Sequence, residues 1–161
     1  MKKIFGLVVM AMSMLFAANA MASTGVESVD AVTSTADYDG DYDGVISNVT
    51  MNGKSYSNED ATFTIESNVL ICDFPQIGKM PGTITVELPI SINEATGEIT
   101  ATPGTSAGFL TLKVGGKATL YLDSLTNAKV ENGTLEFDMA VHGTYLSIIK
   151  FPASFHFKAP K

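Results

Sequence analysis

Short stretches of alternating apolar and polar residues dominate the chain from Asp37 onward. Every even position of Thr83–Ile92 is aliphatic and every odd position is polar or proline, and related alternation recurs in Phe109–Val114, Leu135–His142 and Ile149–Lys158. A period of two buries one face of a β-strand and leaves the other in water. The pattern therefore predicts half-buried antiparallel strands, and no window of a dozen residues after residue 22 has a convincing helical period.

Turn residues separate these stretches and predict how the strands connect. Residues that tolerate positive φ close tight hairpins, and hairpins that follow one another along the chain favour a meander. The fold predicted is all-β, an antiparallel up-and-down (meander) β-barrel of about eight strands, with a β-sandwich as the alternative. The turn signals are Asn52-Gly53, Asn93–Gly97, Pro103-Gly104, Gly115-Gly116 and Asn132-Gly133.

Ten segments are expected to be strands, and some of them are expected to merge. Pro89 and Pro152 fall within strand patterns and cannot donate ladder hydrogen bonds, so each predicts an edge, a bulge or a bent strand. The segments are Tyr42–Met51, Ala61–Glu66, Val69–Phe74, Gly82–Ile92, Glu98–Thr102, Gly108–Val114, Lys117–Leu122, Ala128–Glu131, Thr134–Val141 and Tyr145–Phe157.

The first 22 residues have the pattern of a secretory signal peptide. Two lysines precede the apolar run Ile4–Ala18, and small residues follow it. Cleavage is expected after Ala20 or Ala22, because both sites satisfy the small-x-small rule. The run is shorter than the ~20 residues that span hydrocarbon, so no stable membrane insertion is expected after cleavage.

Three regions follow from these patterns. Residues 1–22 are the expected signal peptide, residues 23–36 a flexible spacer rich in Ser, Thr, Val and Ala, and residues 37–158 the barrel domain. The sequence thus predicts an exported protein, located in the periplasm, at the cell surface or outside the cell. The net charge of −7 argues against nucleic acid as a partner. No pattern predicts an oligomeric state.

The acidic segment Asp37–Gly44 resembles part of a calcium loop. Asp39, Asp41 and Asp43 fall at the first, third and fifth positions of the pattern D-x-D-x-D-G. Thr50 stands at the twelfth position, where the bidentate Glu belongs. We interpret the segment as a solvated acidic entry to the first strand, with weak surface binding of calcium as the alternative. No other metal site and no cofactor is predicted.

No catalytic motif is found, so the chain is not predicted to be an enzyme. His142 and His156 occupy the polar phase of their strands, and no G-x-S-x-G elbow or phosphate-binding glycine loop is present. Cys72, the only cysteine, lies in an apolar run and is expected to be buried and inert. Asp123-Ser124-Leu125 resembles an O-glycosylation acceptor of some Gram-negative anaerobes, with Ser124 as the modified residue.

The order of these features resembles the calycin-like β-barrel domain family, exported proteins of Gram-negative bacteria that are related in shape to lipocalins. The resemblance rests on Tyr42-Asp43-Gly44, Asn52-Gly53, Phe74–Gly82 before a long aliphatic strand, a Gly-Gly hairpin and a closing aromatic strand. It implies an eight-stranded meander barrel and no established activity. The lipocalin signature G-x-W is absent, because the chain has no tryptophan.

Two functions are left open. The first is a barrel that binds a small hydrophobic ligand, and the second is a structural or interaction component of the cell envelope whose barrel is packed solid. An eight-stranded barrel is small enough for its own side chains to fill. The candidate interior residues are Ile84, Val86, Leu88, Leu110, Leu112, Leu135, Phe137, Met139, Phe151 and Phe155.

Overall fold

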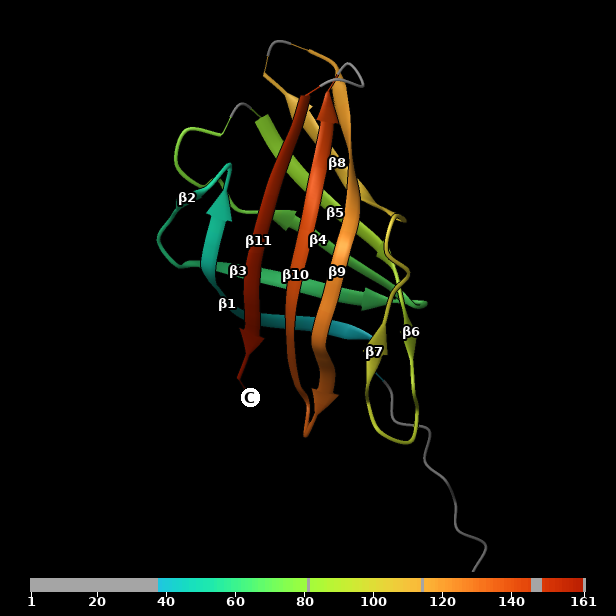
Figure 1. Ribbon diagram of the computed structural model, residues 1–161. Coiled ribbons are helices and arrows are strands. Elements are labelled where there is room, and N and C mark those ends of the chain that lie inside the picture. The colour runs from blue at the N-terminus through green and yellow to red at the C-terminus, as the bar shows by residue number, and fades with distance from the viewer. Residues whose placement is uncertain (1–37, 81, 114, 146–148, 161) are drawn as a thin grey trace, which may run out of the picture. The chain divides into compact units, whose positions relative to one another are not determined.

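The computed structural model describes residues 38–80, 82–113, 115–145 and 149–160. All the elements in these ranges are strands, and eight of them form one closed antiparallel barrel (Figure 1). The predicted all-β meander barrel is thereby confirmed. The expected signal peptide and spacer lie outside the described residues. Within the described ranges, no helix has the length and apolarity needed to cross a membrane.

Each barrel strand pairs with the next barrel strand along the chain, and β11 pairs with β1 to close the barrel. A short strand β2 (Lys54–Ser55) pairs with the end of β1, and β6 (Ser91–Ile92) and β7 (Ile99–Thr100) form a separate hairpin between β5 and β8. The barrel strands are β1 (Gly40–Met51), β3 (Glu59–Glu66), β4 (Val69–Phe74), β5 (Gly82–Pro89), β8 (Ser106–Leu112), β9 (Lys117–Glu131), β10 (Thr134–Tyr145) and β11 (Ile149–Ala159).

Tight turns with two left-handed residues close several hairpins. Asn52-Gly53 has φ values of 50° and 72°, and Asn132-Gly133 has 51° and 75°, as a type I′ turn requires. Both turns were predicted from the Asn-Gly pairs. Ser67-Asn68 joins β3 to β4 with φ values of 50° and 63°. The predicted strands end at Glu66 and resume at Val69, as observed, although this pair contains no glycine and is not among the predicted turn signals.

Several strand boundaries differ by a few residues from the prediction, and the residues involved explain two of these differences. The expected strand Gly82–Ile92 ends as β5 at Pro89, and the N–H of Ile90 donates to the carbonyl oxygen of Asn68 at 2.9 Å. Pro89 has no N–H, so the chain leaves the barrel there. The expected strand Tyr145–Phe157 begins only at Ile149, because β10 continues through Gly143 to Tyr145.

Gly143 accounts for the second difference. It lies within β10, directly opposite Phe151 of β11. A Cβ atom at residue 143 would lie 2.4 Å from the Phe151 ring. The glycine is therefore there to make room for that ring, which is a usual reason for glycine inside a strand.

Two expected strands, Lys117–Leu122 and Ala128–Glu131, form the single strand β9. The register with β10 shifts at Asp123 and again at Asn127, whose φ is 53°. Each bulge inserts one extra residue and changes which face the following side chains occupy. The alternation is therefore interrupted in the sequence although the strand is continuous.

Pro152 lies where the pairing of β11 with β1 ends. Its carbonyl oxygen accepts a hydrogen bond of 3.0 Å from the N–H of Asn52, just beyond the last β1 residue. Its nitrogen points to the same side as its carbonyl, so the missing donor falls at the end of the ladder. Of the three alternatives predicted for Pro152, an edge, a bulge or a bent strand, the structure shows an edge of the β11–β1 ladder.

One half of the barrel interior is filled by aromatic and aliphatic side chains. Phe63 and Phe137 are 0% and 1% exposed, and their ring centroids are 5.1 Å apart in an edge-to-face arrangement. Phe157 lies 4.6 Å from Phe63 and 5.3 Å from Phe137, measured between ring centroids. We call this the packed half; it lies toward the hairpin between β9 and β10, the lower end in Figure 1.

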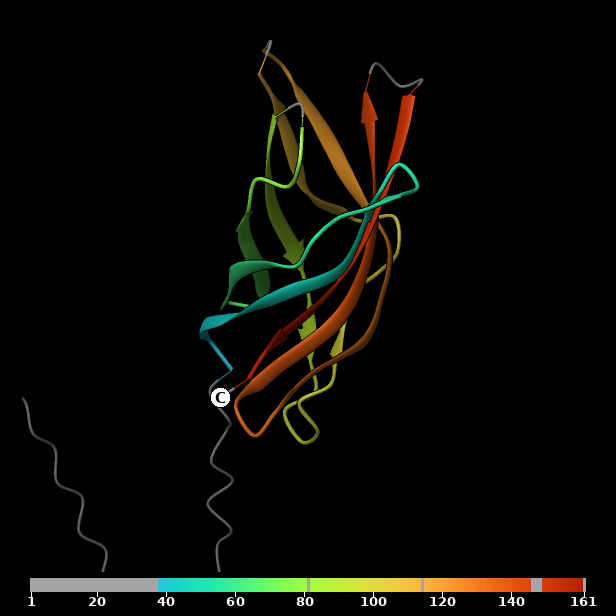
Figure 2. The same cartoon turned by 90° about the vertical axis from the view of Figure 1, so that its left-hand side faces the viewer.

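The opposite end of the barrel, which we call the open end, carries the connections that follow β1, β4, β8 and β10. Figure 2 shows the hairpins β8–β9 and β10–β11 rising at this end. The connection 75–80 also lies here and buries Ile77 and Met80 in the core. The sulfur of Met80 accepts the N–H of Ile77 at 3.2 Å, which holds this connection in a compact form.

Candidate ligand-binding site in the barrel

An apolar cavity of about 180 Å³ lies inside the open end. Ile84, Leu110 and Phe151 contribute to its wall from β5, β8 and β11, and Leu120 and Val141 contribute from β9 and β10. A void of about 20 Å³ adjoins it and shares Ile84, Leu120 and Val141. The barrel interior is therefore packed at one end and hollow at the other.

The ten candidate interior residues divide between these two halves. Ile84, Leu110 and Phe151 line the cavity, and Val86, Met139 and Phe155 line the small void beside it. Leu88, Leu135 and Phe137 belong to the packed core and are each no more than 1% exposed. Leu112 is half-buried and packs against the small cluster of Leu110, Ala118 and Leu120.

Several lining residues were not predicted, because they do not belong to a clear alternating strand. Met51, Asn52 and Tyr56 reach the cavity from the β1–β2 region, and Lys79 and Met80 reach it from the connection after β4. The segment Phe74–Gly82 contributes to the family resemblance, but it predicts no lining residue. Ile77 and Met80 within this segment are the available signal, since neither fits a solvated loop.

The cavity offers no buried polar group to a ligand. Among the residues described, no polar or charged side chain is buried, and none of the buried side-chain nitrogen or oxygen atoms lacks a partner. Lys79, which is exposed, is the one charged residue in the cavity lining. A ligand inside the barrel would thus meet apolar atoms, and any polar part of it would remain near the mouth.

The sheet also opens between β3 and β4. These strands pair only from Thr64↔Ile71 to Glu66↔Val69, after which the rest of β3 pairs only with β1 and the rest of β4 only with β5. A broad groove of about 790 Å³ lies over this divergence, with Asp60 and Asp73 on its two sides. Backbone groups of 59–63 and 72–74 thus lie on unpaired strand edges within the described structure.

Asp41 and Asp43 lie along β1 on its exposed face. Each accepts a hydrogen bond from the hydroxyl of a threonine on β3, at 2.7 Å from Thr64 and 2.6 Å from Thr62. Carboxylates two residues apart on a strand are spaced by about 6.6 Å, whereas a calcium loop makes them converge. The structure describes no group of three or more His, Cys, Asp or Glu able to hold a metal ion. Asp39, just before the strand, accepts the N–H of Ser67 at 3.3 Å.

Both histidines lie on the outer face of the barrel beside carboxylates. Nδ1 of His142 is 2.7 Å from Oδ1 of Asp123, and Nδ1 of His156 is 2.9 Å from Oδ1 of Asp138. The hydroxyl of Ser154, two residues from His156, instead pairs with that of Thr50 at 2.8 Å. In the described part of the chain neither histidine hydrogen-bonds to a serine hydroxyl or a thiol.

The carboxylates around His156 are held in their ionised form. A hydrogen bond from Asn127 holds the pKa of Asp138 below its usual value, with a further contribution from His156. A hydrogen bond of 2.9 Å from Lys158 likewise holds the pKa of Glu136 below its usual value. These groups form a surface charge network, in which Ser124 stands half-buried nearby on β9. Glycosylation of Ser124 stays a prediction.

Cys72 is buried, as predicted, at 2% exposure on the inner face of β4. Burial, followed by the neighbouring charge of Asp73, raises the pKa of its thiol to about 12. Thiol reactivity depends on the thiolate, so the group is chemically inert near neutral pH.

We expect the folded protein to resist alkylation at Cys72. At pH 8 the thiolate fraction is on the order of 10⁻⁴, and the side chain is shielded from the reagent. Mass spectrometry after iodoacetamide treatment would report the extent of labelling with and without guanidinium chloride. Comparable rates in the two conditions would show that the thiol is accessible and contradict the expectation.

Comparison of the chain with family models, with curated proteins and with solved structures finds no match. The class of protein is therefore defined by its fold, a closed eight-stranded antiparallel meander barrel that is compatible with a calycin-like architecture.

Proposed function

We propose that this protein is an exported, non-enzymatic member of the calycin-like β-barrel family that binds a small apolar ligand inside the open end of its barrel. The observation that carries the proposal is the apolar cavity of about 180 Å³. An engineered cavity of roughly 150 Å³ with similar walls takes up benzene, so this volume suits a short chain or a single ring. Export is supported by the signal-like pattern of residues 1–22.

Ligand binding can be tested with octan-1-ol, whose short chain matches the cavity. We expect saturable binding by titration calorimetry and an increase in the melting temperature, because a ligand that binds only the folded state stabilises it. Native mass spectrometry of the purified protein would reveal a ligand retained from the cell. A clean apo mass together with no heat of binding and no thermal shift would count against the proposal.

Replacing Ala153 with phenylalanine is expected to block the cavity. Ala153 faces inward from β11 and lines both the cavity and the adjoining void. A phenyl ring there would occupy much of the available volume, so octan-1-ol affinity should fall by more than about tenfold, a loss of about 1.4 kcal/mol. The ring enters existing space, so overpacking should cost less than about 2 kcal/mol of stability.

The matched control is Thr83→Phe, which adds the same ring to an exposed position next to Ile84 on the outer face of β5. It should leave octan-1-ol affinity within about twofold of the original. Equal affinities for the original protein and a folded Ala153→Phe variant would show that the ligand binds elsewhere.

A second candidate function is an interaction component of the cell envelope, favoured by the divergence of β3 and β4. Unpaired strand edges are templates for the addition of a strand from another chain. Strand addition at this groove would produce oligomers or a stable complex. A monodisperse monomer by light scattering, with no protein captured from envelope extract, would argue against this role.

A further inference from the structure

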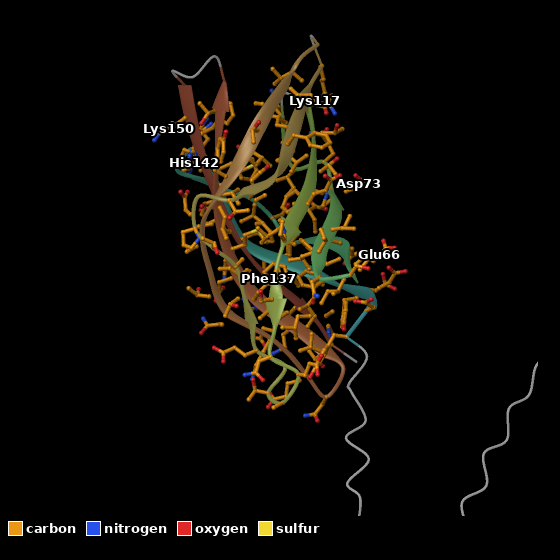
Figure 3. All side chains as sticks on the ribbon, turned by 90° about the vertical axis from the view of Figure 1, so that its right-hand side faces the viewer. Glu66, Asp73, Lys117, Phe137, His142 and Lys150 are labelled. Atoms are coloured by element: carbon orange, nitrogen blue, oxygen red, sulfur yellow. The ribbon has the colours of Figure 1, made fainter. Side chains whose placement is uncertain are left out.

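Positive charge is concentrated around the mouth of the cavity. The connections that meet at the open end, or the strand residues beside them, carry five exposed lysines. Figure 3 shows Lys117 and Lys150 at this end, whereas Glu66 and Asp73 lie farther down the barrel. We call the five residues the lysine rim: Lys54, Lys79, Lys113, Lys117 and Lys150.

No acidic residue lies in the connections at the open end or in the strand ends that border them. These parts of the chain lie within four stretches, 44–58, 74–86, 99–122 and 139–161, that contain no Asp or Glu. The chain nevertheless has 17 acidic residues and a net charge of −7. Five of the seven described lysines therefore lie around the mouth, whereas Lys129 and Lys158 lie farther along the barrel beside carboxylates.

The rim lysines also lack ionic partners. Among the described lysines, only Lys129 and Lys158 form ion pairs, at 2.7 Å with Glu131 and 2.9 Å with Glu136. Lys117 lies over the ring of Phe109, with Nζ 3.9 Å from the ring centroid. The rim ammonium groups are thus available to an external anion.

The cavity and the rim together define the chemistry of a ligand. Inside the cavity a ligand meets apolar side chains, and at its mouth the first charged group is Lys79. Screening limits the reach of surface charges to about 10 Å at 0.1 M salt, so the nearby lysines outweigh the distant carboxylates.

We propose that the site selects amphiphiles with an anionic head group and a short apolar tail. The tail occupies the cavity, and the carboxylate or other anionic head is held by Lys79 with support from the rest of the lysine rim. This inference rests on the proposed ligand-binding function and adds a preference for charge. The ligand is taken up as a monomer from solution.

Octanoate and octan-1-ol have the same apolar tail and differ in the charge of the head group. Comparing their affinities therefore separates a preference for an anionic head group from binding of the tail. In low salt we expect octanoate to bind about fivefold more tightly, since a favourable charge contact at an exposed site is worth up to about that factor. Raising NaCl from about 0.02 to about 0.5 M should remove most of this advantage, because the charges are screened. Octan-1-ol affinity should not fall over the same range.

Charge reversal at the mouth gives a matched pair of variants. Lys79→Glu is expected to weaken octanoate binding about tenfold and to change octan-1-ol affinity by less than about twofold. Lys129→Glu makes the same change of charge toward the other end of the barrel and should leave both affinities within about twofold. Melting curves would establish that both variants are folded.

The outcomes distinguish the two proposals. If octan-1-ol binds as tightly as octanoate and Lys79→Glu has no selective effect, the charge preference is wrong and the apolar site stands. If neither probe binds, both proposals are wrong. If the protein sediments with phosphatidylglycerol vesicles but does not bind soluble octanoate, the lysine rim is a membrane-docking surface and this inference is overturned.

Discussion

Replacing Phe137 with alanine is expected to lower the free energy of unfolding by about 3–5 kcal/mol, the usual cost of deleting a buried phenyl ring. Phe137 is 1% exposed and contacts Phe63, Phe155 and Phe157, with ring centroids 5.1, 6.0 and 5.3 Å away. These rings come from β3, β10 and β11, so collapse of the space would require several strands to move together. Urea denaturation followed by circular dichroism would measure the change.

Phe109→Ala is the appropriate control, because Phe109 lies half-buried on the outer face of β8 beneath Lys117. Its removal leaves no internal cavity and should cost less than about 1 kcal/mol. Similar losses for the two variants would mean that the aromatic cluster contributes no more than a surface contact, contrary to the packing described above.

Gly108→Ala should destabilise the protein by at least about 3 kcal/mol, because two separate penalties combine at this position. Gly108 has a φ of 113°, and it sits opposite Val86 beside a register shift in β8. A Cβ atom there would lie 2.0 Å from the carbonyl oxygen of Thr85 and 2.9 Å from the nitrogen of Glu87. Those atoms belong to the backbone of β5, so relief would require the two strands to separate.

Gly104→Ala measures the cost of positive φ alone, without the clash that Gly108→Ala adds. Gly104 also has positive φ, at 83°, but nothing lies within 4 Å of the position of its Cβ atom. It should lose only the roughly 1–2 kcal/mol typical of an L-residue held in a left-handed conformation, at most about two thirds of the Gly108 effect. Equal melting temperatures for the two variants would rule out the predicted clash between β8 and β5.

The strand content and the meander could be predicted because both depend on local patterns. Alternation in segments such as Thr83–Ile92 indicates which face of a strand is buried, and the Asn-Gly turns indicate where hairpins close. The bulges at Asp123 and Asn127 could not be predicted, because an interrupted alternation looks the same as a loop. The expected break between Val141 and Tyr145 is wrong, because β10 continues through Gly143 opposite Phe151.

Sequence patterns could not predict the cavity. Ile84 and Leu88 lie on the same face of β5 and belong to the same alternation, yet Ile84 lines the cavity and Leu88 is fully buried in the packed core. The two residues differ in their level along the barrel, and alternation reports which face a side chain occupies but not how well that level is packed. The rim lysines are far apart in the sequence, and only the strand topology shows that they lie at one end of the barrel.

The placement of the first and last strands bears on how the protein could be attached to something else. β1 begins and β11 ends at the end of the barrel opposite the cavity mouth, where Val45 pairs with Lys158 (Figures 1 and 2). The described chain therefore begins and ends away from the mouth. A tag or immobilising surface joined to that end of the barrel would leave the mouth free, so the cavity can be loaded while the protein is anchored.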